Sequence, residues 1–174
     1  LKAEFGPGFH LHMYTSIPFR PEWASEFAEA GLDEIRFHLL DLETERYRET
    51  IAACSEAGIL TGVEIPCEPD REDDLLELLE TLRDLEVSFL NLNELEITVG
   101  NHHNMELRGF NLSTEITAGA AGSAELAIAM RDRVMAAERG DPDPKDGEMR
   151  EAYGYHLKFC TAVYKDAGQM RRRF

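Results

Sequence analysis

The sequence predicts an α/β fold made of repeated βα units on a parallel sheet. Short β-branched, aromatic and aliphatic runs alternate with amphipathic stretches of helical period over the first 97 residues. The middles of four predicted strands, near Leu11, Phe37, Gly62 and Leu90, recur at about 25 to 28 residues, the length of a strand, a helix and two short loops. Strands that alternate with helices in this way form parallel sheets. The spacing leaves open whether the sheet is open or forms part of a barrel.

The first 58 residues are predicted to hold two strands and three helices. The predicted strands are residues 9–14 and 34–40, and the predicted helices are residues 1–5, 21–31 and 44–58. Pro21 suits the first turn of a helix, where its missing N–H costs nothing. Thr44 is expected to cap the third helix, and Gly31 and Gly58 suit the left-handed residue that ends a helix.

The next segment repeats the pattern, with strands over residues 60–65 and 87–93 and a helix over residues 70–85. Asp70 is expected to cap this helix, and its leucines form one apolar stripe: Leu75, Leu78, Leu79, Leu82 and Leu85. The stretch from Val87 to Ile97 begins as an apolar strand and ends with two amides and two carboxylates, namely Asn91, Asn93, Glu94 and Glu96. Ligands of parallel α/β folds bind at this carboxyl end.

The remaining chain departs from this rhythm. The chain is predicted to be one domain in three parts: residues 1–97 with regular βα units, 98–147 as an irregular excursion plus a helix, and 148–174 as a final strand and helix. Ser123 is expected to cap the helix of the second part, which Gly140 ends. The final strand and helix are expected over residues 155–160 and 166–173.

The charge distribution limits the partners of the chain. The net charge of −16 over 174 residues argues against binding to nucleic acid or to an anionic membrane. Only four of the 18 basic residues are lysines. An acidic, lysine-poor surface is expected of a protein kept soluble in very high salt, where the Debye length falls to about 3 Å at 1 M. We therefore expect a halophilic, archaeal source.

The cysteines indicate a reducing compartment. Cys54, Cys67 and Cys160 are odd in number and far apart, which is no disulfide framework. The sequence shows no signal peptide and no apolar run long enough to span a membrane. A cytoplasmic location is expected. Because the chain starts at Leu1 in what reads as the end of a helix, we also expect it to be a piece of a longer protein.

Polar side chains lie at the C-terminal end of every predicted strand, which favours a ligand site over plain surface. They are Thr15, Ser16, Asp41, Glu64, Cys67, Asn93, Glu94, Cys160 and Thr161. If these strand ends share one rim, the rim could hydrogen-bond a hydroxylated, amine-bearing small molecule.

The histidines are weaker candidates. His102 and His103, with Glu94 and Glu96 nearby, could hold a metal, but adjacent histidines point in different directions and a solvated loop explains them better. His10, His12 and His38 fall in predicted strands and are expected to be hydrogen-bonded core or rim residues.

Several segments together resemble a known family. Leu-Thr-Gly-Val-Glu-Ile-Pro at 60–66, Phe-Leu-Asn-Leu-Asn-Glu-Leu-Glu at 89–96, and Tyr-His-Leu-Lys-Phe-Cys-Thr at 155–161 with the arginine-rich tail resemble the later half of a radical S-adenosylmethionine (radical SAM) domain. More narrowly, the chain resembles archaeal proteins related to pyruvate formate-lyase activating enzyme. The resemblance covers nearly the whole chain and implies an incomplete TIM-like barrel of parallel strands.

The resemblance implies binding of S-adenosylmethionine by six residues: Thr15, Ser16, Gly62, Glu64, Asn93 and Glu94. The glycine and glutamate of the third strand correspond to a family segment that backs the adenosyl group, although the glutamate comes one place early. The hydroxyls after the first strand correspond to a position near the ribose. The pair at the end of the fourth strand corresponds to the adenine pocket.

The second cofactor of the family, a 4Fe-4S cluster, finds no matching ligands in the chain. The family holds it with a CxxxCxxC loop, whereas the cysteines here are separated by 13 and 93 residues. The Gly-Gly-Glu segment that holds the methionine group is absent too. We therefore expect the chain to be the C-terminal part of a barrel whose N-terminal half is its missing partner. Cys160 is kept as a weak candidate near the site.

The implied reaction is reductive cleavage of S-adenosylmethionine to a 5′-deoxyadenosyl radical, which this fragment should not perform by itself. The substrate, a small molecule or a protein, is not identified. Two alternatives remain: an unrelated metal-dependent barrel hydrolase or isomerase, and a non-catalytic barrel fragment that binds a ligand.

Overall fold

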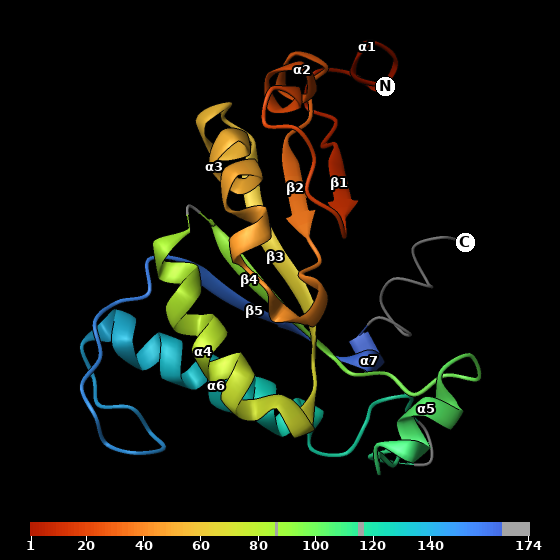
Figure 1. Cartoon of the computed structure of the whole chain (residues 1–174), viewed down its shortest axis with the longest axis vertical. Helices are drawn as coiled ribbons and strands as arrows, with labels where there is room; N and C mark the ends of the chain where they lie inside the picture. The colour runs from red at the N-terminus through yellow and green to blue at the C-terminus, as the bar shows by residue number, and fades with distance from the viewer. Residues whose placement is uncertain (86, 115–116, 165–174) are drawn as a thin grey trace. The chain divides into compact units, whose positions relative to one another are not determined.

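The computed structural model describes residues 1–85, 87–114 and 117–164. Its centre is a five-stranded sheet in the order β1-β2-β3-β4-β5 (Figure 1). The strands are β1 (His12–Thr15), β2 (Glu34–Phe37), β3 (Leu60–Cys67), β4 (Phe89–Glu94) and β5 (His156–Cys160). The predicted α/β fold with a parallel sheet is confirmed. The strand order never reverses, as in a βα barrel and unlike a doubly wound sheet.

Helices lie between the strands, as the sequence predicts. They are α1 (Lys2–Phe5), α2 (Trp23–Glu29), α3 (Arg48–Glu56), α4 (Glu72–Thr81), α5 (His102–Leu107), α6 (Ser123–Arg139) and α7 (Ala162–Tyr164), with 3-10 turns at Leu40–Leu42, Glu45–Tyr47, Pro69–Arg71 and Leu82–Asp84. The predicted leucine stripe from Leu75 to Leu85 is buried throughout. The helix predicted over residues 166–173 lies outside the described residues.

The chain groups into two compact units. The first unit holds Leu1–Glu64, Glu77–Leu90 and Gly154–His156, and the second holds Ile65–Leu76, Asn91–Tyr153 and the chain from Leu157 onward. The prediction of a single domain with boundaries at residues 97 and 147 stays a prediction.

In the first unit, one face of the sheet carries the core. Ile35 and Phe37 of β2 and Val63 of β3 are fully buried, and α2 and α3 cover this face (Figure 1). Phe37 contacts Tyr47 with ring centroids 6.2 Å apart. Successive side chains of a strand point to opposite faces, so the alternate residues of these strands line the other face, where Gly62 and Glu64 of the predicted site are found.

In the second unit, α6 buries one side of its length. Leu126, Met130 and Val134 recur at helical spacing and are nearly or fully buried. A smaller cluster around Leu95 and Ala120 packs in the same unit against the partly buried Met105 and Phe110, among others. The predicted irregular excursion is therefore held by an apolar core of its own.

Three predicted helix caps are wrong. The side chain of Thr44 makes no capping hydrogen bond, and a 3-10 turn separates it from α3. Asp70 lies in the 3-10 turn before α4 and its carboxylate pairs with Arg108 at 2.6 Å. Gly122 occupies the cap position of α6, while Ser123 is the first helical residue. In each case a tertiary contact or an extra turn competes with the local capping pattern.

Two predicted strand ends are also wrong. The second strand ends at Phe37 rather than at residue 40, because a 3-10 turn with left-handed Asp41 (φ 55°) and Leu42 (φ 60°) follows. Glu64 lies inside the eight-residue β3 and not at its end. Its partners are therefore the side chains beside it in the sheet.

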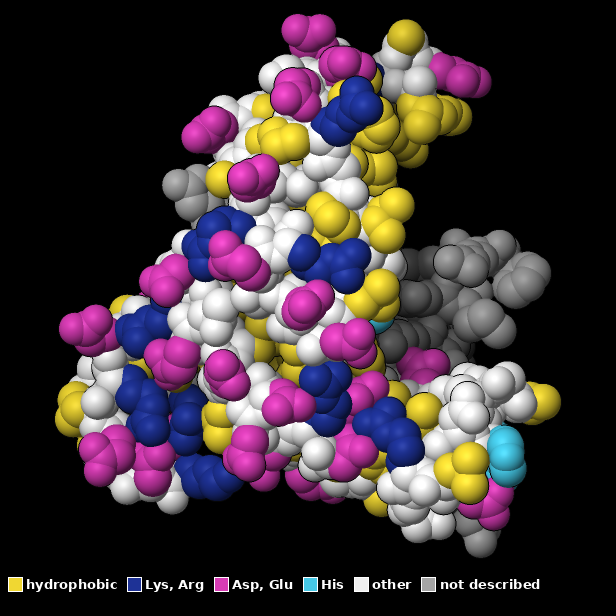
Figure 2. Space-filling view, viewed as in Figure 1, with side chains coloured by type: hydrophobic (Ala, Val, Ile, Leu, Met, Phe, Trp, Pro, Cys, Tyr) yellow, Lys and Arg dark blue, Asp and Glu magenta, His cyan; other side chains and the backbone are white. Residues whose placement is uncertain are grey.

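The face of the described chain shown in Figure 2 is rich in acidic side chains, with basic side chains between them. None of the described helices is long and apolar enough to cross a membrane.

Candidate functional site

In the first unit, the face of the sheet opposite the core carries a polar row. In the parallel register Tyr14 pairs with Arg36, and Arg36 pairs with Gly62. Residues in register project to the same face, so the side chain of Arg36 lies between a tyrosine on one side and a position without a side chain on the other.

Arg36 is the centre of a hydrogen-bonded ion network. Its Nη1 donates to Glu64 Oε2 at 2.7 Å and to the Tyr14 hydroxyl at 2.8 Å, and its Nε donates to Glu34 Oε1 at 2.5 Å. The Glu34 side chain is only 8% exposed and that of Glu64 17%. Such a network fixes the carboxylate of Glu64 in one place.

The ionisation of this network is tuned by its partners. Burial lowers the pKa of Arg36, but its hydrogen bonds to Glu34 and Glu64 outweigh this, and the net pKa is raised. The pKa of Tyr14 is also raised, first by burial and second by the charge of Glu64. Arg36 therefore stays cationic and Tyr14 stays a neutral phenol.

Gly62 has a packing role of its own. A Cβ placed there would lie 2.1 Å from Cζ of Phe89, whose ring lies directly over the glycine. Phe89 is itself almost fully buried, and the Arg36 guanidinium stands 5.5 Å from its ring centroid. The need for glycine at this position is thus explained by the chain itself. A cofactor-binding role for Gly62 stays a prediction.

Thr15 is the last residue of β1, one position later than the predicted end of this strand, and Ser16 begins the turn that follows. The Thr15 hydroxyl donates to the carbonyl of Ile17 at 2.6 Å, which occupies it locally. The Ser16 carbonyl accepts a hydrogen bond from the Tyr47 hydroxyl at 2.7 Å, while Ser16 itself is exposed. Of the two predicted ribose contacts, Ser16 is the more available.

In the second unit, Glu94 is buried and used within the fold. Its Oε2 accepts the backbone N–H of Ala162 at 2.7 Å. A Cβ on Gly119 would lie 2.0 Å from Oε1 of the same carboxylate. Glu94 therefore connects β4 to the segment after β5, and its predicted contact with the cofactor stays a prediction.

The other face of β4 carries a row of amides. Asn91 Nδ2 and Asn93 Oδ1 are 3.4 Å apart, and the Cys160 thiol donates to Asn91 Oδ1 at 3.5 Å. Asn91 is buried, whereas Asn93 is half-buried. The structure therefore places the weak candidate Cys160 beside an amide, and Asn93 is the more accessible member of the row.

The cysteines of the chain do not fit a 4Fe-4S cluster. Cys54 and Cys67 are buried and Cys160 is half-buried, and they lie 13 and 93 residues apart in the sequence, unlike the closely spaced cysteines of a CxxxCxxC loop. Within the described residues no group of three or more His, Cys, Asp or Glu could hold a metal ion. His102 and His103 begin α5 and are exposed.

Sequence reasoning missed the residues that hold Glu64 and Glu94 in place. Arg36, Tyr14 and Glu34 were not singled out, although Glu34 and Arg36 alternate along one predicted strand and must therefore share a face. That alternation was a usable signal. Phe89 and Gly119 offered none, because each acts through a partner about 25 residues away in the sequence.

The sequential strand order defines a parallel βα protein, and one face of the sheet in its first unit carries the polar row described above. The chain is 34% identical over 186 residues to a protein of Methanocaldococcus jannaschii provisionally named as a glycyl-radical enzyme activating enzyme. The match covers 99% of this chain and 44% of that protein. The chain thus spans less than half the length of this relative. No protein-family model matches the chain, and no solved structure matches it.

Proposed function

We propose that the chain is part of a radical SAM protein related to glycyl-radical enzyme activating enzymes and supplies the wall that binds S-adenosylmethionine. The observation that carries this proposal is the 34% identity over 99% of the chain to a protein with that name. The parallel βα architecture in sequential strand order agrees with it.

The proposed binding residues come from the six predicted from the sequence. Glu64, held by Arg36, accepts hydrogen bonds from ribose hydroxyls or from the methionyl amine. Asn93 offers an amide that donates and accepts. Ser16 adds an exposed hydroxyl. The other three residues act mainly through the fold. Thr15 shapes the turn after β1, Gly62 leaves space for the ring of Phe89, and Glu94 accepts the backbone N–H of Ala162.

The 4Fe-4S cluster of such an enzyme is proposed to be held outside this chain. When bound, the cluster supplies the electron for reductive cleavage of S-adenosylmethionine. The residues of this chain orient the cofactor and exclude water from it. The proposed partner is the N-terminal half of the barrel, and the final substrate, a small molecule or a protein, stays open.

Isothermal titration calorimetry with S-adenosylmethionine tests the binding wall. We expect saturable binding that Glu64→Gln and Asn93→Ala each weaken about tenfold, as loss of a hydrogen bond to a charged or polar ligand predicts. Glu4→Gln, an exposed carboxylate of α1, is the matched control. Binding that is indifferent to both site variants contradicts the assignment of these residues.

The chemistry needs the protein together with its cluster-binding half. After anaerobic reconstitution of the cluster and addition of a reductant, we expect 5′-deoxyadenosine to form. An intact cluster that yields none contradicts the proposed reaction class, even if the cofactor binds to this chain.

We also propose that the chain is adapted to a salt-rich cytoplasm, as its net charge of −16 suggests. Salt screens the mutual repulsion of acidic side chains, which otherwise opposes the compact state. Thermal melts should therefore give a higher Tm in multimolar KCl than in dilute buffer. Equal values in both would contradict halophilic adaptation.

A further inference from the structure

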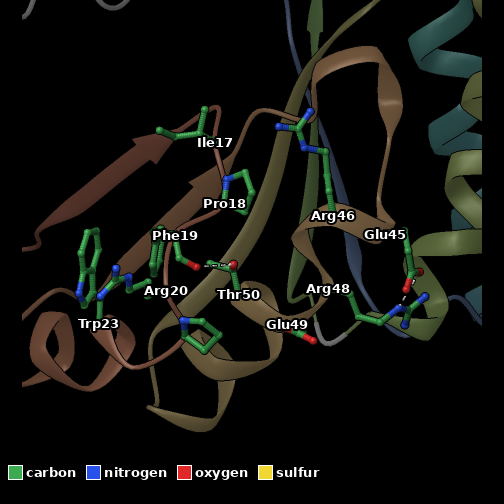
Figure 3. Close-up of a pocket in the computed structure, with 11 residues that line it drawn as sticks. Ile17, Pro18, Phe19, Arg20, Trp23, Glu45, Arg46, Arg48, Glu49 and Thr50 are labelled. Carbon is green, nitrogen blue, oxygen red and sulfur yellow. Dashed lines mark hydrogen bonds and ion pairs between the residues drawn. The ribbon is translucent and has the colours of Figure 1, made fainter.

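A pocket of about 730 Å³ opens in the first unit, between the loop after β1 and the start of α3 (Figure 3). None of the residues predicted to bind S-adenosylmethionine lines it. Its apolar wall is unusually exposed for large side chains, since Ile17 is 65% and Trp23 is 44% accessible. Trp23 and Phe19 lie nearly parallel, with ring centroids 6.4 Å apart. The wall thus presents an aromatic surface to solvent.

The loop that forms this wall is held rigidly. The buried Tyr47 hydroxyl donates to the carbonyl of Ser16 at 2.7 Å, and the buried Thr50 hydroxyl donates to the carbonyl of Phe19 at 3.0 Å. Two buried side chains therefore fix the loop at both ends. The exposed aromatic wall is a built feature of the fold and is not left over from a loosely placed segment.

The pocket also carries three arginines in a strongly acidic chain. Arg20, Arg46 and Arg48 line it together with the carboxylates of Glu45 and Glu49, so that cations outnumber anions by one. Arg48 pairs with Glu45 at 3.0 Å, on the side of the pocket away from Trp23 (Figure 3). Arg20 lies beside Trp23, and within the described residues its guanidinium has no ion pair or hydrogen bond. An arginine without a partner, next to an exposed aromatic ring, can bind a ligand that carries an anionic group beside an apolar group.

We propose that this pocket binds an acidic segment of a partner protein, with an apolar side chain against Phe19 and Trp23 and a carboxylate on Arg20. A guanidinium pairs with a carboxylate through two parallel hydrogen bonds. Tryptophan and arginine are the residues that most often carry binding energy at protein interfaces. Pockets for small molecules bury most of their ligand, which this open wall does not do. The site is independent of the proposed binding of S-adenosylmethionine.

The fluorescence of Trp23 reports on the pocket directly, because it is the only tryptophan of the chain. The probe is a blocked peptide of alternating leucine and aspartate, and its control has asparagine in place of aspartate. We expect a saturable blue shift with the acidic peptide and binding at least tenfold weaker with the asparagine peptide. Equal affinity for both peptides, or no saturable change, overturns the proposal.

Variants locate the contact. Arg20→Gln should weaken binding of the acidic peptide about tenfold, and Arg139→Gln, at the exposed end of α6, should leave it unchanged. Matching thermal melts show that both variants are folded. An unchanged affinity in Arg20→Gln overturns the proposal. So does tighter binding of phenylpropionate than of the peptide, because the pocket would then be a small-molecule site.

Discussion

Glu64 and Glu94 come from the same sequence pattern, a carboxylate near the end of an apolar strand, but the fold uses them differently. Glu64 in the first unit is partly buried and pairs with Arg36 at 2.7 Å. Glu94 in the second unit is buried and accepts a backbone N–H at 2.7 Å. The comparison teaches that the same pattern can give a carboxylate held by a side chain of a neighbouring strand or one held by the backbone of a distant segment.

Each region also depends on one glycine. At Gly62 an added Cβ meets the ring of Phe89 at 2.1 Å, and at Gly119 it meets the carboxylate of Glu94 at 2.0 Å. The two regions thus share a design in which a missing side chain admits a larger one. They differ in the side chain that fills the space, which is the aromatic ring of Phe89 in the first unit and the carboxylate of Glu94 in the second.

The largest expected effect comes from filling these gaps. Gly62→Ala should lower the free energy of unfolding by about 3 kcal/mol, because the buried Phe89 ring must move. Gly119→Ala should cost about 1 to 3 kcal/mol, because Glu94 must turn away from the Ala162 N–H. Urea denaturation measures both values.

Double-mutant cycles check the cause of each loss. Phe89→Leu should recover part of the Gly62→Ala loss, and Glu94→Ala should recover part of the Gly119→Ala loss. Additive losses in either cycle would show that the glycine is required for another reason, such as backbone conformation.

A smaller effect separates the two carboxylates. Glu94→Gln should lower the free energy of unfolding by about 1 to 2 kcal/mol, since a charge-assisted hydrogen bond inside the fold is weakened. Glu64→Gln should cost less than about 1 kcal/mol, because Arg36 keeps Glu34 as a partner in a partly accessible pair. A larger loss of stability for Glu64→Gln than for Glu94→Gln would contradict the view that Glu94 is the carboxylate on which the fold depends more.

The smallest effect is a change in titration. Tyr14 has a raised pKa, so its neutral phenol is favoured in the folded chain. It contributes stability that is present below its ordinary pKa of 10.0 and lost as the pH rises through the raised value. Glu64→Gln should lower the pKa of Tyr14 by removing a neighbouring negative charge. Titration followed by the ultraviolet absorbance of phenolate measures this pKa, after the curve of the Tyr14→Phe variant is subtracted to remove the other tyrosines. Glu4→Gln is the control and should leave the pKa of Tyr14 unchanged.

Much of the fold could be predicted because it follows from local periodicity. All five strands and the leucine stripe of α4 follow from the spacing of apolar residues. The strand ends could not be placed as well. Glu64 reads as a terminal residue because Pro66 follows it, yet proline is tolerated inside β3 and the strand continues to Cys67.

The candidate site was predictable only in part. The residue types at the strands could be anticipated, but the partners of Glu94 could not, since Ala162 lies 68 residues further on. Ser123 shows the same limit. It has the sequence of a helix cap, but its buried hydroxyl instead joins the carbonyl of Cys67 to the N–H of Leu95.

The unequal burial of the three cysteines has a practical consequence. The thiols of Cys54 and Cys67 are buried and stay protonated at neutral pH, so they react slowly with alkylating reagents. Cys160 is half-buried at the end of β5, beside Asn91. A maleimide dye or spin label should therefore attach at this one position without any engineered cysteine, which gives the second unit a natural reporter of its own.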